Sequence, residues 1–125
     1  MQHGAKRALK LAVSAPFHTS LMKPAARKLV KDLDEVVFKK PKFKILHNCN
    51  CKTEDDPKVI KTLMIEQIYS PVLWSQSIRS MEALGVTQII ECGSGRVLTG
   101  LTRRINRDYE PVSYTHLTLP TKLSV

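Results

Sequence analysis

Apolar residues recur every three or four positions in four separate stretches of the chain, with polar residues between them. This is the spacing of one buried face of an α-helix, so each stretch predicts an amphipathic helix. The first stretch is the clearest, because its opposite face carries mainly lysine and arginine. The predicted helices span 20–36, 57–70, 75–84 and 96–105.

The ends of two of these helices carry residues that mark helix boundaries. Thr19 or Ser20 is the expected N-cap of the first helix, and Pro24 is tolerated because it lies in the first turn. Asp56 is a capping side chain ahead of a proline at the first helical position. Pro71 should end that helix.

Short apolar runs before and between the helices predict β-strands at 8–14, 44–48 and 86–92, the last of them buried. Strands that alternate with such helices are typical of an α/β fold with a largely parallel sheet. A turn at 93–95, Gly-Ser-Gly, should lead into the last helix. It could hold a phosphate at the helix N-terminus, but it lacks the full spacing of a phosphate-binding motif, so a tight-turn role is the preferred interpretation.

Composition favours one soluble domain. The chain has 125 residues, of which 42% are hydrophobic and 25% charged, enough for a modest core. No apolar run approaches the ~18 residues of a membrane span, and the N-terminus lacks the apolar stretch of a signal peptide. The three cysteines form no disulfide framework. We therefore expect a protein of the reducing cytoplasm, with no membrane partner.

The formal net charge of +9 indicates either an acidic partner or a solvated basic surface. Nucleic acid is disfavoured as that partner, because aromatic residues make up only 6% of the chain and no nucleic-acid-binding motif is present. A solvated basic surface is the most common explanation of such a charge, and an acidic protein partner is the alternative.

The most informative candidate for chemistry is His18, in the run VSAPFHTSLM between an apolar stretch and the first helix. A histidine at such a corner is held by rigid elements while its ring can face a cleft, which suits a general base. A base of this kind normally activates a serine, but no serine lies in a G-x-S-x-G turn. From these residues alone, a structural histidine hydrogen-bonded at a helix start is the more common alternative.

A metal site is the alternative for a second group of residues. His47, Cys49 and Cys51 alternate, so on a strand their side chains would lie on one side. Structural zinc normally has four ligands and no fourth is apparent, so core thiols are the preferred interpretation. We expect no metal and no bound cofactor.

Residues 109–125 depart from the pattern of the rest of the chain. From Val112 to Thr121 the run looks like a transposon end and a sequencing adaptor translated in one frame. We therefore interpret 109–125 as a non-native or disordered tail, adaptor-like from about 112, and assign no chemistry to His116.

Three blocks, VSAPFHTSLMKPAARKL, EQIYSPVLW and ECGSGRVLTGLTRRI, closely resemble the C-terminal part of the bacterial malonyl-CoA:acyl-carrier-protein transacylases. They follow the order and spacing of that family over about 5–106. The resemblance implies the C-terminal part of a three-layer acyltransferase domain with a mostly parallel, α/β-hydrolase-like sheet. Residues 1–13 would end a small ferredoxin-like subdomain, and 14–108 would belong to the large subdomain.

The resemblance also implies an activity, the transfer of malonyl from malonyl-CoA to the phosphopantetheine thiol of acyl carrier protein in fatty-acid synthesis. The mechanism would be ping-pong catalysis at a serine, with His18 as general base and the backbone carbonyl of Gln67 orienting its ring in place of a carboxylate. Asn48 matches a position near the family's site, and Phe17 resembles a malonyl-selecting residue. The implied partners are malonyl-CoA and the acidic carrier protein, and the parent enzyme is expected to be a monomer.

The motifs that the chain lacks limit this interpretation. The family's G-H-S-x-G nucleophile motif is not found in the sequence, and neither the arginine that grips the malonyl carboxylate nor the oxyanion amides have a counterpart. We therefore expect a fragment that is inactive alone and leaves apolar surfaces uncovered. Two alternatives are an acyltransferase domain of a polyketide synthase, and a small basic binding protein without catalysis, which should unfold cooperatively.

Overall fold

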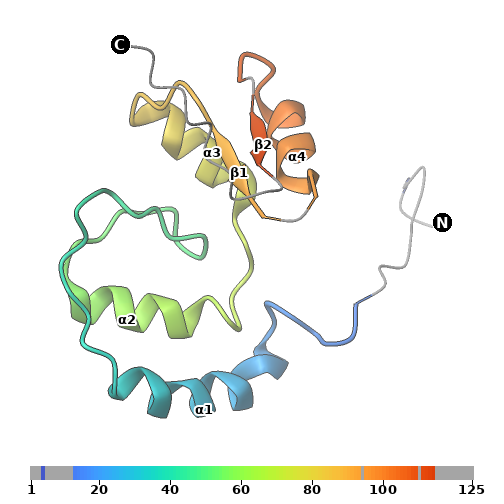
Figure 1. Cartoon of the computed structure of the whole chain (residues 1–125). Coiled ribbons are helices and arrows are strands. Elements are labelled where there is room, and N and C mark those ends of the chain that lie inside the picture. The colour runs from blue at the N-terminus through green and yellow to red at the C-terminus, as the bar shows by residue number, and fades with distance from the viewer. Residues whose placement is uncertain (1–3, 5–12, 94, 110, 115–125) are drawn as a thin grey trace. The chain divides into compact units, whose positions relative to one another are not determined.

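The computed structural model describes residue 4 and the ranges 13–93, 95–109 and 111–114. Helices dominate this part of the chain, and two short strands complete it (Figure 1). None of the helices in these ranges is long and apolar enough to cross a membrane. In chain order the elements are the 3₁₀ helix η1 (Ser20–Met22), α1 (Lys23–Asp34), α2 (Pro57–Glu66), α3 (Trp74–Ala83), β1 (Ile90–Cys92), α4 (Val97–Ile105) and β2 (Val112–Tyr114).

All four predicted helices are present, with ends that differ by a few residues. Asp56 caps α2 as predicted, because its Oδ1 accepts a hydrogen bond from the Lys58 N–H at 2.9 Å. Pro24 lies in the first turn of α1, also as predicted. Thr19 precedes η1 in extended backbone, but its hydroxyl donates to the Pro16 carbonyl at 2.8 Å and caps no helical N–H.

The predicted strand at 44–48 is wrong. Leu46 makes one isolated antiparallel bridge with Thr53, and the residues between them turn back on themselves. Within that turn the His47 N–H donates to the Lys52 carbonyl at 3.0 Å. The backbone groups of this segment are therefore used inside a tight loop and not in a sheet.

The predicted buried strand at 86–92 is reduced to β1, and it is not buried, since Ile90 is 49% exposed. A strand needs a partner backbone, and β2 offers only three residues, in parallel register with Ile90 opposite Val112. The Val86 carbonyl instead accepts the Tyr109 hydroxyl at 2.8 Å. Of the predicted strand 8–14, residues 8–12 lie outside the described residues, and 13–14 form no strand.

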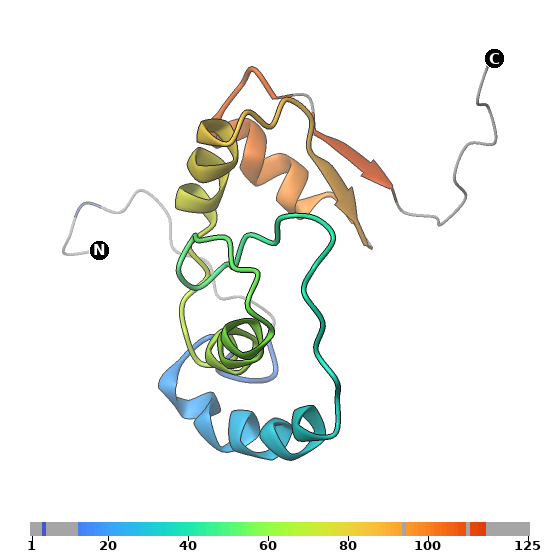
Figure 2. The ribbon, with the colours of Figure 1, turned by 90° about the vertical axis from the view of Figure 1, so that its left-hand side faces the viewer.

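The described residues divide into two compact units, one made of residues up to Lys42 with Asp55–Val72, the other of Phe43–Glu54 with the residues from Leu73 onward. This division cuts through the predicted block 14–108. In the first unit α1 and α2 lie side by side, as both views show (Figures 1 and 2). Its core contains the buried apolar side chains Ala26, Leu33, Ile60 and Leu63.

The second unit contains α3, α4 and the two strands, with Ile78, Thr102 and Tyr109 among its most buried side chains. The packed chain continues past Asp108, beyond the predicted start of the tail. The Tyr109 ring is buried because it completes this small core, and β2 pairs with β1. Residues 110 and 115–125, with His116, lie outside the described residues, and the adaptor-like origin of 112–121 stays a prediction.

Candidate functional site

His18 sits in a backbone conformation that few residues adopt. Phe17 and His18 occupy a turn ahead of η1, and the bond from the Thr19 hydroxyl to the Pro16 carbonyl spans this turn. His18 has a φ of 58°, in the left-handed region where non-glycine residues are uncommon. Holding a side-chain-bearing residue there costs on the order of 1–3 kcal/mol, and such strain concentrates at functional sites.

The His18 ring meets two backbone carbonyls from the end of α2. Its Nδ1 lies 2.9 Å from the Gln67 oxygen and 3.2 Å from the Ser70 oxygen. A carbonyl oxygen can only accept, so Nδ1 must carry a hydrogen. In the neutral ring Nε2 is then the nitrogen with the free lone pair, and it can take a proton from a hydroxyl or a thiol. His18 itself is exposed to solvent.

The position of Gln67 explains why its carbonyl is suited to this role. Gln67 is the C-cap of α2, and its own N–H bonds the Leu63 carbonyl at 3.0 Å. The last carbonyls of a helix have no intrahelical donor and carry the negative end of the helix dipole. Nearby, the Lys23 ammonium lies 5.6 Å from the centre of the Tyr69 ring, which links α1 to the segment after α2.

Phe17 and Asn48 are two further residues that the resemblance placed near the substrate. Phe17 is 55% exposed and directly precedes His18 in the turn. Asn48 belongs to the second compact unit, where its backbone carbonyl accepts the Leu73 N–H at 2.9 Å. Their roles in substrate binding stay predictions.

The alternative metal site at His47, Cys49 and Cys51 is not formed. No group of three possible ligands occurs in the ranges that the structure describes. The alternation along a strand does not apply, because these residues lie in a tight loop. Cys51 Sγ instead lies 3.5 Å from the Leu73 carbonyl and 3.6 Å from Ser77 Oγ.

The N-terminus of α4 is occupied by a side chain that sequence reasoning did not single out, Glu91. Its carboxylate accepts the Leu98 N–H at 3.1 Å, the Thr99 N–H at 2.8 Å and the Thr99 hydroxyl at 2.6 Å. These bonds, the Thr99 hydroxyl first among them, lower the pKa of Glu91. Because an internal carboxylate already uses these donors, the tight-turn interpretation of 93–95 is favoured over a phosphate site.

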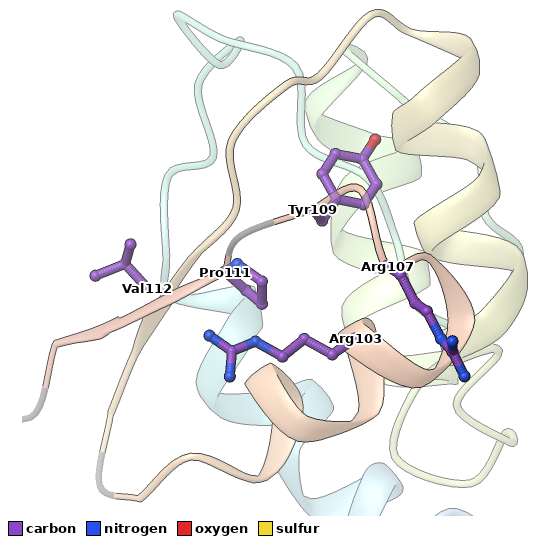
Figure 3. A pocket seen from close by; sticks show the side chains of 5 residues that line it. All are labelled: Arg103, Arg107, Tyr109, Pro111 and Val112. Carbon is purple, nitrogen blue, oxygen red and sulfur yellow. The ribbon is translucent and has the colours of Figure 1, made fainter.

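One surface cavity, of about 620 Å³, is lined by two arginines and by residues that follow α4 (Figure 3). Its lining residues are Arg103, Arg107, Tyr109, Pro111 and Val112. The two guanidinium groups point away from each other, so they do not form a bidentate anion site. Burial, followed by the charge of Glu82, raises the pKa of the Tyr109 hydroxyl, which donates to the Val86 carbonyl. The better candidate for chemistry is thus the His18 clamp, by which we mean the His18 ring and the backbone carbonyls of Gln67 and Ser70 that face its Nδ1.

The curated proteins that are similar to this chain share one name. No family model matches the chain. The malonyl CoA-acyl carrier protein transacylase of Haemophilus influenzae is 44% identical over 110 residues, covering 88% of this chain and 35% of that protein. The Bacillus subtilis transacylase is 43% identical over 112 residues, covering 90% of this chain and 35% of that protein.

Solved structures agree. An acyl carrier protein S-malonyltransferase from Vibrio cholerae matches 93% of this chain and 38% of its own, with a TM-score of 0.86 and 46% identity. A type II polyketide-synthase acyl carrier protein in complex with its malonyl-transacylase matches 90% of this chain and 36% of its own, with a TM-score of 0.84 and 43% identity.

The relatives are transacylases and malonyltransferases by name. The chain is similar to one part of the malonyl-CoA:acyl-carrier-protein transacylases, which confirms the resemblance seen in the sequence. The chain spans about one third of the length of the curated relatives it matches.

Proposed function

We propose that this chain supplies the histidine of a malonyl transfer reaction, in which a malonyl group passes from malonyl-CoA to the phosphopantetheine thiol of acyl carrier protein. One observation supports the role of His18 above all: two carbonyls face its Nδ1, which leaves Nε2 as the basic nitrogen of the neutral ring. The reaction and its substrates come from the names of the relatives.

The nucleophile in this proposal is a serine that the chain does not contain. The serine oxygen attacks the thioester carbonyl carbon of malonyl-CoA while its proton passes to Nε2 of His18. The tetrahedral intermediate collapses to a malonyl ester, and coenzyme A leaves as a thiol with the proton from His18. In the second half, the carrier-protein thiol gives its proton to Nε2 and attacks the ester, and the serine regains that proton. The Nδ1–H remains bonded to the Gln67 carbonyl throughout, in place of a triad carboxylate.

The finer features of the parent enzyme belong to the same proposal. It would be a cytoplasmic monomer with a three-layer, α/β-hydrolase-like domain and a ferredoxin-like subdomain, and it would need no cofactor beyond its substrates. The exposed cations of α1, Lys23, Arg27, Lys28 and Lys31, give the first unit a basic face that suits an acidic carrier protein.

A chimera tests the proposal directly. Residues 14–108 of this chain would replace the matching region of the Haemophilus influenzae relative, and malonyl transfer to carrier protein would be measured with labelled malonyl-CoA. We expect an active chimera, and a loss of about 10²- to 10⁴-fold in kcat/KM on His18→Ala, the usual contribution of a general base. His47→Gln is the matched control, because it removes a histidine outside the proposed machinery. An active chimera that tolerates His18→Ala would contradict the role given to His18.

A second candidate function is malonyl loading in polyketide synthesis, because one similar structure contains a polyketide-synthase carrier protein. The same chimera separates the two when fatty-acid and polyketide carrier proteins compete for malonyl. Phe17→Ala sharpens this test, since loss of an exposed ring beside the base should admit the extra methyl of methylmalonyl-CoA if Phe17 selects malonyl. Unchanged discrimination would remove Phe17 from the substrate site.

A further inference from the structure

Pro71 stands at the position that would donate the helical hydrogen bond to the Gln67 carbonyl. In an α-helix, the carbonyl of each residue accepts the N–H of the residue four positions later. For Gln67 that residue is Pro71, which has no N–H. The helical hydrogen bond that would otherwise occupy this carbonyl therefore cannot form.

The neighbouring backbone hydrogen bonds do not use the Gln67 carbonyl either. The N–H groups of Ile68 and Tyr69 donate to the carbonyls of Ile65 and Glu66, at 3.3 and 3.2 Å. Within the described residues, the only donor to the Gln67 carbonyl is Nδ1 of His18.

Pro71 also acts on the second carbonyl of the clamp. A residue that precedes proline is disfavoured in helical conformation, because the proline ring collides with it. Ser70 is that residue, and α2 has already ended at Glu66. Released from the helix, the Ser70 carbonyl comes within 3.2 Å of the same Nδ1. The same proline thus removes the helical donor of the Gln67 carbonyl and restricts the backbone of Ser70.

We propose that Pro71 is a positioning residue for His18: by withholding an N–H from Gln67 and ending the helical path at Ser70, it directs both carbonyls to Nδ1 and fixes the ring as the Nδ1–H tautomer. Pro71 touches no reacting atom in this scheme. The structural part of this inference is independent of the reaction, and only its consequence for catalysis rests on the proposed function.

Pro71→Ala in the full 125-residue chain is the test, because it restores the missing N–H with a good helix former. Two quantities would be measured by NMR: the tautomer of the His18 ring, from its ¹⁵N shifts, and the hydrogen exchange of the new amide at position 71. We expect that amide to exchange at least about tenfold more slowly than an unstructured one, as a helical bond to Gln67 requires. We also expect the Nε2–H tautomer, which this proposal makes the minor form in the parent chain, to rise to a comparable population.

Pro57→Ala is the matched control, because Pro57 lies in the first turn of the same helix, where a missing N–H leaves no carbonyl unpaired. It should leave the His18 tautomer unchanged. Pro71→Gly restores the same N–H without favouring helix, so it serves if Pro71→Ala does not stay folded. An unaltered Nδ1–H tautomer in a folded Pro71 variant, or an amide at position 71 that exchanges freely, would overturn the inference.

In the chimera, Pro71→Ala should lower kcat/KM, with kcat reduced more than KM is raised, and should alter the pH profile of kcat/KM. A plain packing defect would not be expected to move the pH profile. The tautomer result stands even if the chimera is inactive, so the failure of the proposed function and the failure of this inference are separate outcomes.

Discussion

Helix α4 of the second unit buries a different kind of side chain from α1 and α2 of the first unit. In the first unit, α1 and α2 bury apolar residues, such as Leu33 and Leu63, as amphipathic helices normally do. In the second unit, the buried residues of α4 are Thr99 and Thr102. Three apolar residues of α4 are exposed instead, Val97 at 71%, Leu98 at 41% and Leu101 at 38%. The first unit completes the His18 clamp from its own residues, whereas α4 of the second unit leaves an apolar face exposed.

The sheet of the second unit also exposes apolar side chains on one of its faces. The Glu91 side chain points to the N-terminus of α4, whose N–H groups it accepts. Side chains alternate along a strand, so Ile90 and its register partner Val112 belong to the other face, and both are exposed. Parallel sheets are almost always covered on both faces. This open face agrees with a chain that spans one third of its relatives' length.

The largest loss of stability is expected from a substitution in the core of the second unit, and it tests whether the two units are independent. Ile78 is completely buried, and its truncation in Ile78→Ala should cost about 2–5 kcal/mol of unfolding free energy. If the units are independent, amide exchange should rise in α3 and α4 but not in α2. Urea unfolding together with residue-resolved exchange measures both. Equal loss of protection in α2 would show that the units fold as one.

A smaller, pH-dependent effect is expected at Glu91. Its pKa is lowered in the folded chain, so its carboxylate stabilises the fold above the ordinary pKa of glutamate, and this stability is lost as the pH falls through the lowered pKa. Glu91→Gln should lower stability at about pH 7 and flatten the acid dependence of the urea midpoint. Thr62→Val, in α2 of the first unit, is a control that should leave the acid dependence as it is. If the urea midpoint of Glu91→Gln fell with decreasing pH as it does in the parent chain, the Glu91 carboxylate would contribute nothing to stability.

Removal of the α2 cap should have a modest effect confined to the first unit. Asp56→Ala removes the bond to the Lys58 N–H and should cost about 1 kcal/mol, the usual value for a capping side chain. The loss falls at the opposite end of α2 from the His18 clamp. The His18 tautomer should therefore persist while the first turn of α2 exchanges faster, as NMR can record. A change of tautomer would mean that the clamp depends on the whole helix.

The smallest effect on stability is expected for the exposed apolar face of α4. Leu101→Ser should change the unfolding free energy by no more than about 0.5 kcal/mol, as is common for exposed sites. It should, however, reduce self-association, measured by light scattering, because it removes part of an uncovered apolar face. A strong loss of stability would mean that Leu101 is packed in solution. Sharply cooperative unfolding of the parent chain would favour the alternative of a small binding protein.

The sequence predicted helices well and strands poorly, for a physical reason. Helix signals are local: the apolar period and the cap at Asp56 lie within a few residues of each other. A strand depends on a distant partner, so apolar runs such as 44–48 and 86–92 were overpredicted where that partner is short or lacking within the described residues.

The site shows the same limit. His18 stood out from its place in the sequence, but its link to Gln67, 49 residues away, came only from the family resemblance. Every residue has a backbone carbonyl, so a sequence does not show which carbonyl will contact a side chain. The contact of the Ser70 carbonyl with His18 Nδ1 was therefore missed. Pro71 was recognised as a helix end, and only the structure connects that end to the His18 ring. Glu91 was missed because its contact with α4 depends on the turn between them.

The central claim is that His18 is held as a base by backbone carbonyls, and its ring tautomer in the parent chain tests that claim most directly. Long-range ¹H–¹⁵N spectra of the 125-residue chain, with His18→Gln used to assign the signal, identify the protonated nitrogen. A protonated Nδ1, with a coupling across the hydrogen bond to the Gln67 carbonyl carbon, is the predicted result. A ring that carries its hydrogen on Nε2 at neutral pH would contradict it, because no carbonyl could then hold Nδ1.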